Sequence, residues 1–372
     1  MRIIEKYSNQ KLKIYQLIQK PQLRGAEIFA SQLSSHLMAL GQQCILITIF
    51  EGDGELPFHG EIVHLNRPLG KRLLDFVGWK QLADVIKKDN PDLIQANAGD
   101  TLKFAVFSKL FFRWKTPIVF RNANKMSDFI DSKPKFWFNK FLLNRVAYVI
   151  SVSESCSEDL VTFFSLPKKK VDTVEIGIEL HPIGHMPVDL VSIFNRGPVL
   201  IHVASMVPEK NHHGLLRIFK MVIAKMVDVQ LLVIGKGKLE AELKHYAHQL
   251  GIENQVHFLG SRTDVMEIMK FSKALLLPSK IEGLPGVILE AMYAHCPVVA
   301  YRVGGIGEVI DHNQTGLLTT KDDEESFAEL VTNLLNNEEL RKKLTLSGSH
   351  FAASKFDNRM IAKRFLEIYK RI

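Results

Sequence analysis

Two carboxylates on either side of a turn are the residues of this chain best placed to do chemistry. Glu282 and Glu290 flank a glycine-bearing turn in the segment SKIEGLPGVILE, which follows a short apolar run typical of a buried parallel strand. Pro285 suits the first turn of a helix, so the backbone N–H groups of Gly286 and Val287 are expected to be free for a phosphate oxygen. The carboxylates would repel phosphate and instead suit hydroxyl groups. The segment therefore favours a nucleotide-sugar as ligand.

This segment, with Pro297–Ala300 and Gly304–Gly305 after it, resembles the signature of the retaining GT-B glycosyltransferases, the family 4-like glycosyl transferases of group 1. The resemblance implies that Glu282 contacts the donor sugar and that Glu290 contacts the ribose. It also implies that the donor diphosphate is bound by the backbone of Gly283, Leu284, Pro285, Gly286 and Val287. Spacing alone leaves an alternative, which is a Rossmann-like helix carrying two solvated acids.

A lysine from another part of the chain is expected at the same site. Residues 199–204 are typical of a strand and residues 205–211 of a loop leading into a helix, so Lys210 would face the same crevice. In the family, such a lysine neutralises the donor diphosphate and stabilises the leaving group. The resemblance therefore gives Lys210 and Glu282 the catalytic roles. Ser205 stands where the family commonly has an arginine, which removes one positive charge. An ordinary surface lysine is the alternative for Lys210.

Two further segments are expected on the donor side. Gly235 and Gly237 follow an apolar run, but Glu240 occupies the third glycine position of a dinucleotide fingerprint, so that motif is incomplete. The segment 256–262, which ends at Arg262, resembles the part of the family that lines the nucleobase pocket. Gly235 and Arg262 are therefore donor-binding candidates, together with Ser205. This pattern does not identify the base.

In the N-terminal half, Gly25 lies between an expected strand, Lys13–Ile18, and an expected helix. A glycine at such a loop permits close approach of the backbone to a ligand. The family often carries two glycines in the equivalent loop, beside the donor phosphate and the acceptor. Only Gly25 is present here, and the adjacent Arg24 is a candidate for the charge missing at Ser205.

Asn97 and Asp100 are candidates for binding the acceptor. They follow the expected strand Asp92–Gln95, where many family members place a histidine near the reaction centre. An amide orients a sugar hydroxyl but cannot act as a base at neutral pH. The resemblance implies a front-face reaction in which the departing phosphate receives the acceptor's proton, and this mechanism does not need the histidine. A helix N-terminal aspartate is the alternative for Asp100.

Length and composition agree with two globular domains. The chain has 372 residues, of which 46% are hydrophobic and 24% charged. Strand-like runs alternate with helical stretches in both halves, which predicts an α/β protein with doubly wound parallel sheets. The resemblance makes this the GT-B fold, two Rossmann-like domains facing a central cleft. We predict an acceptor-side domain over 1–185, a donor-binding domain over 186–350, and a helix over 351–372 that crosses back to the first domain.

The net charge of +8 suggests an anionic partner. Basic residues alternate with Phe and Trp in Lys103–Lys115 and Lys133–Arg145, a composition that suits a membrane interface. Neither segment is long enough to span a bilayer, and core phenylalanines with solvated lysines are the alternative. We expect peripheral contact with an anionic membrane. Nucleic acid is not expected as a partner, because no nucleic-acid-binding motif is evident.

Localisation, redox state and metal use follow from what the sequence lacks. The opening MRIIEKYSNQ has no apolar region of the kind a secretory signal needs, so we expect a cytoplasmic protein at or beside the inner face of the cell membrane. Cys44, Cys156 and Cys296 are far apart, as expected of reduced thiols. Neither an Asp-x-Asp triplet nor H-E-x-x-H occurs, so we predict no metal site. No cofactor is expected, because the nucleotide-sugar is a substrate.

The sequence therefore predicts a retaining, metal-independent hexosyltransferase. The donor would be a nucleoside diphosphate-sugar, and the acceptor a lipid-linked glycan or polysaccharide in cell-envelope glycan synthesis. One alternative is an epimerase or phosphorylase of the same architecture. Another is a catalytically silent nucleotide-sugar-binding scaffold, suggested by Ser205 and Asn97. The nucleobase, the sugar, the acceptor, the linkage and the oligomeric state are not readable from the sequence.

Overall fold

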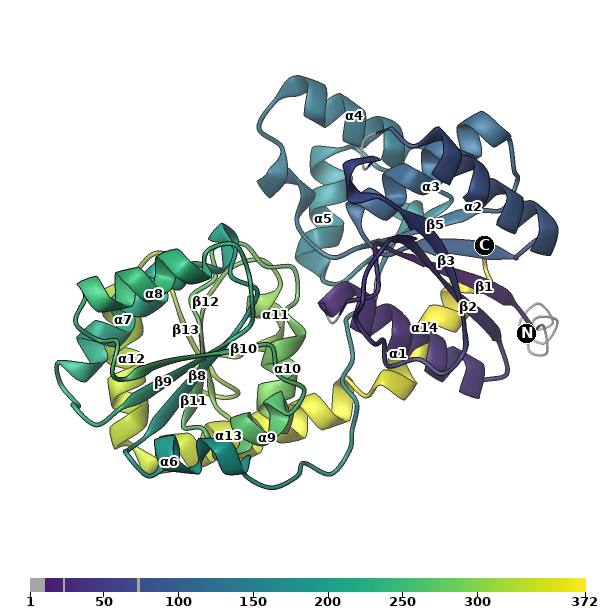
Figure 1. The fold of residues 1–372 in the computed structure, drawn as a ribbon. Helices are drawn as coiled ribbons and strands as arrows, with labels where there is room; N and C mark the ends of the chain where they lie inside the picture. The colour runs from purple at the N-terminus through teal and green to yellow at the C-terminus, as the bar shows by residue number, and fades with distance from the viewer. Residues whose placement is uncertain (1–10, 23, 72–73) are drawn as a thin grey trace. The chain divides into compact units, whose positions relative to one another are not determined.

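The computed structural model describes residues 11–22, 24–71 and 74–372, and the chain forms two compact units (Figure 1). The first unit comprises Met1–Gly177 and Asn358–Ile372, and the second comprises Ile178–Asp357. Each unit contains one large sheet whose neighbouring strands are all parallel. The predicted α/β architecture with a doubly wound sheet in each half is confirmed.

The divisions between the units lie elsewhere than after residues 185 and 350, where the sequence placed them. The amide of Ile178 donates to the carbonyl of Phe356 at 2.7 Å, which ties the start of the second unit to its end. Helix α13, Glu338–Lys355, runs continuously through the expected second division. The helix expected over 351–372 is therefore two helices. The end of α13 stays in the second unit, and α14, Asn358–Tyr369, belongs to the first.

The sheet of the first unit has the strand order β3-β2-β1-β4-β5-β6-β7. Its strands are β1 (Lys13–Ile18), β2 (Gln43–Phe50), β3 (Glu61–Arg67), β4 (Leu93–Ala96), β5 (Ile118–Asn122), β6 (Tyr148–Ser151) and β7 (Val171–Thr173). Figure 1 shows α2, α3 and α4 on one face and α1 and α14 on the other. The helices are α1 (Gly25–Ala39), α2 (Phe76–Asp89), α3 (Gly99–Phe112), α4 (Lys133–Leu143) and α5 (Glu154–Phe163), with short 3₁₀ turns η2 (Leu69–Lys71), η3 (Met126–Phe129) and η4 (Lys168–Lys170). Because helices cover both faces, the central strands read as continuous apolar runs.

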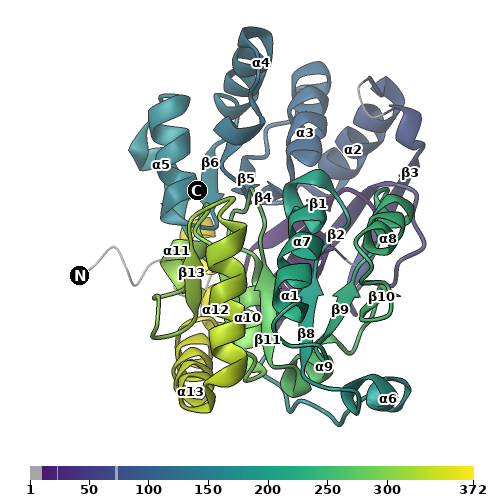
Figure 2. The same cartoon turned by 90° about the vertical axis from the view of Figure 1, so that its left-hand side faces the viewer.

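The sheet of the second unit has the order β10-β9-β8-β11-β12-β13. Its strands are β8 (Val199–Val203), β9 (Gln230–Ile234), β10 (Val256–Gly260), β11 (Ala274–Leu277), β12 (Val298–Tyr301) and β13 (Leu317–Thr319). The helices are α6 (Val191–Phe194), α7 (His212–Ile223), α8 (Glu240–Gln249), α9 (Val265–Phe271), α10 (Gly286–Tyr293), α11 (Ile306–Val309) and α12 (Glu324–Asn336), with α13 and the 3₁₀ turns η5 (Val188–Leu190) and η6 (Pro208–Lys210). Helix α7 packs against α12 on one face, as Figure 2 shows, and α10 packs against α13.

The last helix is fixed to the first unit by aromatic packing and by several side-chain hydrogen bonds. Phe365 of α14 packs on Phe29 of α1, with ring centroids 5.6 Å apart. The hydroxyl of Tyr369 donates to Oε1 of Gln95 on β4 at 2.6 Å. All three aromatic residues are buried, so α14 is part of the core of the first unit.

Each sheet has one point where successive connections leave in opposite directions. In the first unit this point lies between β1 and β4, and in the second it lies between β8 and β11. Ligands of doubly wound proteins bind at the carboxyl ends of the strands at such a point, because the diverging loops leave a crevice there. The loops after these four strands carry Gln19, Asn97, Lys210 and Glu282.

Candidate functional site

Lys210 and Glu282 meet at the carboxyl ends of β8 and β11. Nζ of Lys210 donates to Oε1 of Glu282 at 2.6 Å, although the two residues lie far apart in the sequence. Glu282 is 4% exposed, whereas the lysine side chain is partly open to solvent. The second unit thus brings together the two residues that the sequence predicted to be catalytic. A charged hydrogen bond of this kind is stronger than a neutral one.

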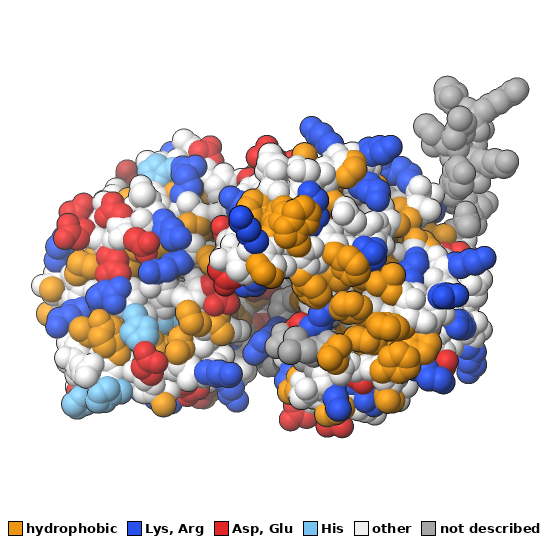
Figure 3. All heavy atoms as spheres, turned by 90° about the horizontal axis from the view of Figure 1, so that it is seen from above, with side chains coloured by type: hydrophobic (Ala, Val, Ile, Leu, Met, Phe, Trp, Pro, Cys, Tyr) orange, Lys and Arg blue, Asp and Glu red, His pale blue; other side chains and the backbone are white. Residues whose placement is uncertain are grey.

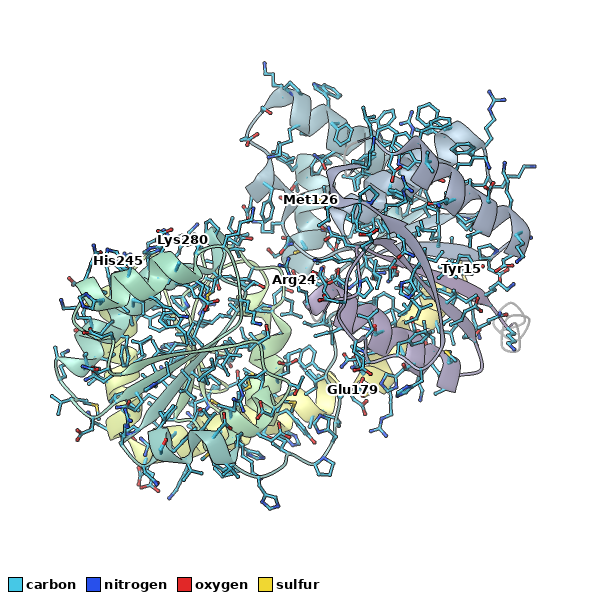
Figure 4. All side chains as sticks on the ribbon, viewed as in Figure 1. Tyr15, Arg24, Met126, Glu179, His245 and Lys280 are labelled. Atoms are coloured by element: carbon cyan, nitrogen blue, oxygen red, sulfur yellow. The ribbon has the colours of Figure 1, made fainter. Side chains whose placement is uncertain are left out.

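Two hydrogen bonds between the loops hold this pair in place. The amide of Lys280 donates to the carbonyl of Glu209 at 2.8 Å. Nδ2 of Asn211 donates to the carbonyl of Pro278 at 3.0 Å. Asn211 has a left-handed backbone with φ of 53° and also caps α7, because its side chain accepts from the amide of Gly214. The loop after β8 is thereby fixed to the loop after β11, where Figure 4 labels Lys280.

The paired glycines Gly304 and Gly305 support the Glu282 loop through backbone contact. The amide of Gly305 donates to the carbonyl of Gly283 at 2.6 Å. Gly304 has φ of +52°, and a Cβ at this position would lie 1.7 Å from the carbonyl oxygen of Glu282. A side chain cannot be accommodated there, so glycine is required for the close approach of the two loops.

Helix α10 presents the phosphate-binding geometry that the sequence predicted. It begins at Gly286 with Pro285 as its N-cap. Within the described residues, the N–H groups of Gly286 and Val287 make no backbone hydrogen bond. Free donors at the positive end of a helix are suited to a phosphate oxygen.

Glu290 lies within α10, and its carboxyl group has no hydrogen-bond or ion-pair partner among the residues that the structure describes. It is half-buried, and burial raises the pKa of its carboxyl group. A half-buried carboxyl without a partner is stabilised when a hydroxyl group donates to it. This geometry suits the ribose contact expected from the sequence.

The glycines after β9 bring a third loop to the same edge of the sheet. Gly235 has φ of +133°, and a Cβ there would lie 2.0 Å from the carbonyl oxygen of Ala204. The amide of Met206 donates to the carbonyl of Lys236 at 3.1 Å, so this loop lies directly against the one that carries Ser205. Gly235 therefore has a packing role, whatever it contributes to ligand binding.

The guanidinium of Arg262 forms ion pairs with two carboxylates other than Glu282 and Glu290. Its guanidinium donates to Asp264 at 2.7 and 2.8 Å and to Asp189 at 2.7 and 3.2 Å. These hydrogen bonds raise the pKa of Arg262. Its side chain makes no contact with Lys210 or Glu282, so in this structure its charge is held by Asp189 and Asp264.

Two buried, neutral histidines lie close to the Lys210 site, and neither was assigned a role from the sequence. His202 and His212 are buried, with ring centroids 4.7 Å apart. Nδ1 of His202 lies 2.7 Å from the carbonyl oxygen of Leu276. Burial lowers the pKa of His202 to about 4 and that of His212 to about 2, so both rings stay uncharged near Lys210. The sequence signal was the placement of His202 within an apolar strand.

In the first unit, the acceptor-side candidates are engaged within the fold. The buried Nδ2 of Asn97 donates to Oε1 of Gln16 at 2.9 Å, and Nε2 of Gln95 donates to Oδ1 of Asn97 at 3.0 Å. Nε2 of Gln19 donates to Asp100 at 2.6 Å, and Lys103 lies 3.4 Å from the same carboxylate. A structural role therefore accounts for much of the polarity of Asn97 and Asp100.

These two residues nevertheless line a pocket of about 650 Å³, together with Arg121 and Asn122 at the end of β5. The sequence analysis missed both residues. A charged residue before an amide carries no recognisable motif in the sequence. Figure 4 labels Met126, which also lines this pocket, and Arg24 at the start of α1.

Gly25 and Arg24 are exposed at the start of α1. A Cβ at Gly25 would meet nothing within 4 Å, so packing does not require a glycine there. Residue Leu23, next to them, lies outside the described residues.

The described residues include neither a candidate metal site nor a helix that could span a membrane. Over residues 11–22, 24–71 and 74–372, no three His, Cys, Asp or Glu side chains gather as a metal site would require. No helix in these ranges has the length and apolarity to cross a bilayer.

Both units match known families. Residues 191–350 match the family described as glycosyl transferases group 1, and residues 23–181 match the family described as glycosyltransferase family 4. The Anabaena protein HepE, solved in complex with UDP-glucose, has the same fold with a TM-score of 0.83 at 21% identity, over 97% of this chain and 100% of that one.

Two curated relatives match part of the chain. N-acetyl-alpha-D-glucosaminyl L-malate synthase of Bacillus anthracis is 32% identical over 171 residues, 46% of this chain and 45% of the relative. N-acetylgalactosamine-N,N'-diacetylbacillosaminyl-diphospho-undecaprenol 4-alpha-N-acetylgalactosaminyltransferase of Campylobacter jejuni is 26% identical over 234 residues, 62% of each chain. The matched segments span 45% and 62% of the length of these two relatives. Because the two family matches cover both units and the fold is shared, the chain belongs to the group 1 glycosyltransferases of the GT-B fold.

Proposed function

We propose that this protein transfers a hexose-type sugar from a nucleoside diphosphate donor to a lipid-linked or polysaccharide acceptor in cell-envelope glycan synthesis. The observation that carries the proposal is the contact between Lys210 and Glu282 at the switch point of the second sheet. The relative from Campylobacter jejuni is named for a diphospho-undecaprenol acceptor, and HepE was solved with UDP-glucose. A lipid-linked acceptor and a UDP-sugar donor are therefore the first substrates to test.

Different residues of the second unit would bind different parts of the donor. Lys210 would move from Glu282 to the diphosphate and stabilise the charge that develops on the leaving group. The N–H groups of Gly286 and Val287 would bind a phosphate oxygen. Glu282 and Glu290 would accept hydrogen bonds from the sugar and the ribose.

We propose a retaining, front-face reaction. The bond between the anomeric carbon and the phosphate oxygen breaks, and the acceptor oxygen bonds to the anomeric carbon on the same face. The acceptor's proton passes to the departing phosphate oxygen, so no protein base is needed. Asn97, whose amide is held by Gln16 and Gln95, cannot serve as that base. The stereochemistry of the product, measured by NMR, tests this step, and an inverted anomer would exclude it.

We further propose that the reaction requires neither a divalent metal ion nor a cofactor. In this mechanism, Lys210 and the start of α10 supply the positive charge that a metal ion supplies in other sugar transferases. Turnover should be unchanged when EDTA replaces added Mg²⁺ or Mn²⁺. Loss of turnover in EDTA that is restored by one metal ion would refute this part of the proposal.

The assay that tests the function is direct. UDP, GDP, ADP and their common sugar conjugates are titrated into the full chain and into Lys210→Ala. A selective ligand that depends on Lys210, followed by sugar transfer to an acceptor, supports a transferase. Binding without any turnover supports the scaffold alternative. Turnover without an acceptor supports an epimerase, and turnover that requires inorganic phosphate supports a phosphorylase.

We also propose that the first unit contacts an anionic membrane through an aromatic surface formed by Phe111, Phe129, Trp137 and Phe138. These side chains are exposed, Trp137 by 63% and Phe111 by 55%. Figure 3 shows hydrophobic side chains interspersed with Lys and Arg on this part of the molecule. Exposed rings beside cations suit the headgroup region of a bilayer.

Part of the expected membrane segments belongs to the core. Trp114 is buried and its Nε1 donates to Oγ of Ser108 at 3.0 Å, and Phe104 is also buried. Phe136 stacks on the buried Phe164 with centroids 5.4 Å apart. Substitutions that test membrane contact should therefore avoid these three residues.

Trp137→Ser with Phe138→Ser is the cleaner test. We expect the double variant to sediment less with vesicles of anionic phospholipid, while its melting temperature stays close to that of the wild type. Thr162→Ala with Ser165→Ala, elsewhere in the first unit, is the control. Equal sedimentation of a folded double variant would contradict membrane contact through this surface.

A further inference from the structure

The first unit buries a cation that forms no ion pair or hydrogen bond with any residue that the structure describes. Arg121 lies at the end of β5 and is 4% exposed. Its side chain makes no hydrogen bond or ion pair within the described residues, and its Nε is buried without a partner. The guanidinium lies 3.9 Å from the ring centroid of Phe29, a favourable cation–π distance. Burial of an unpaired charge is costly, so this arrangement indicates a partner that binds from outside the fold.

The nearest acidic groups do not neutralise this cation. Glu27 is buried on α1, where Nε2 of Gln22 donates to its Oε1 at 3.0 Å, and it forms no ion pair with Arg121. Burial raises the pKa of Glu27, and its attraction for Arg121 is a smaller influence on the guanidinium than burial, which lowers the pKa of Arg121. Asp100 lies on the wall of the pocket but is engaged by Gln19 and Lys103.

Two further donors line the same pocket. Asn122 is 2% exposed, and its Nδ2 is buried without a partner. Gly99, the first residue of α3, makes no backbone hydrogen bond through its N–H within the described part of the chain. Arg121, Asn122 and Gly99 all line the pocket of about 650 Å³ at the carboxyl ends of β4 and β5. A pocket of this size holds an anionic group together with the organic part that carries it.

We propose that Arg121, Asn122 and the N-terminus of α3 form a subsite for an anionic group of the acceptor, a phosphate or a carboxylate. The proposal rests on the proposed transferase function, because it assigns the occupant to the acceptor. A guanidinium binds either group through paired N–H donors, and the amide and the helix N-terminus add further donors of the same kind. The subsite thus selects acidic acceptors over neutral sugars.

The test is a titration of the full chain, saturated with UDP so that the probes cannot report on the Lys210 site. Inorganic phosphate and succinate serve as separate probes, and binding is measured by calorimetry. We expect one of them to bind, with an affinity at least about tenfold weaker in Arg121→Gln. Phosphate binding identifies a phosphorylated acceptor, and succinate binding identifies an acceptor with carboxylates.

Matched variants separate the subsite from general effects. Arg145→Gln also removes an arginine stacked on a phenylalanine, since its guanidinium lies 3.5 Å from the Phe141 centroid, and it should bind the probe as the wild type does. Asn122→Asp gives Arg121 a counterion without a change of size, and it should weaken binding even if Arg121→Gln does not fold. Asn144→Asp, with the same charge change on the surface, is its control.

The outcomes keep this inference apart from the proposed function. If UDP binds but neither probe binds, or both bind equally well to Asn122→Asp, the subsite is refuted and the donor assignment stands. If none of UDP, GDP and ADP binds to the wild type, the proposed function fails. The probe titration without UDP then still decides whether Arg121 holds an anion.

Discussion

The two candidate sites handle buried charge in opposite ways. In the second unit, Lys210 and Glu282 pair at 2.6 Å, and hydrogen bonds between their loops hold them together. In the first unit, Arg121 is buried with an aromatic ring beside it and no carboxylate in contact. In the protein without ligand, the two charges of a paired site stabilise each other, and a ligand must replace that internal contact. An unpaired one gains its only counterion when ligand binds, so its affinity depends strongly on ligand charge.

The largest effect is expected at the paired site. Lys210→Ala should lower turnover by about 100-fold or more, because it removes charge stabilisation of the leaving group. Sugar transfer or donor hydrolysis measures it, with the melting temperature as a check on folding. Lys280→Ala is the matched control, since its side chain pairs with Asp322 at 3.3 Å and its backbone contact to Glu209 survives. Turnover near the wild-type rate in Lys210→Ala would remove the basis of the assignment.

Glu282→Gln should have a smaller effect, a loss of at least about tenfold in kcat/KM for the donor. The amide keeps the size of the side chain and still accepts a hydrogen bond, but it no longer pairs with the charge of Lys210. The matched substitution Glu290→Gln should mainly weaken binding of the nucleotide. If Glu282→Gln and Glu290→Gln weaken UDP binding equally and neither changes how the sugar is bound, the separate roles proposed for the two carboxylates are wrong.

Gly304 in the second unit and Gly25 in the first differ in how closely other atoms surround them, so their substitution by alanine should affect stability differently. Gly304→Ala should lower the free energy of unfolding by more than about 1 kcal/mol, because its Cβ would overlap the carbonyl of Glu282. Gly25→Ala should change it by less than about 0.5 kcal/mol, because the position is open. Urea titration measures both. A drop in turnover without loss of stability in Gly25→Ala would support the expected approach of ligand to that loop, and equal stability losses would contradict the contrast.

The neutral histidine pair predicts a modest pH dependence of stability. The pKa of His202 is lowered to about 4 and that of His212 to about 2, whereas in the unfolded chain both are near about 6.5. Below about pH 6.5 the unfolded state binds more protons than the folded state, so the free energy of unfolding falls as the pH falls.

We therefore expect the melting temperature to drop between about pH 7 and about pH 5, and to drop less in His212→Asn. His245→Asn, an exposed histidine labelled in Figure 4, is the control and should leave the slope unchanged. An equal slope in His212→Asn and the wild type would show that His212 does not titrate as proposed.

The second unit was largely readable from the sequence because the proposed diphosphate site consists of short, local patterns. The turn from Glu282 to Glu290 carries its own strand end, helix start and proline, all of which the structure contains. The boundaries were less accurate, because the helix that ends at Lys355 and the pairing of Ile178 depend on contacts distant in sequence.

The candidate acceptor site of the first unit was not readable in this way. Asn97 was chosen for its position after a strand, and its amide proves to be held by Gln16 and Gln95. Arg121 and Asn122 looked like ordinary strand residues. Nothing local distinguishes a buried unpaired arginine from one that is solvated or bound to a carboxylate, because its partners come from other elements.

The sequence by itself determined the alternating strands and helices and the donor signature, because periodicity and turn chemistry act over a few residues. It also determined that Ser205 lacks the charge common in the family. Only the tertiary structure decided that Lys210 meets Glu282, that Arg262 is paired elsewhere, and that Arg121 forms no ion pair with a described residue. Those facts depend on which loops each sheet brings together at its own carboxyl edge. Burial then sets the electrostatic cost of each charge.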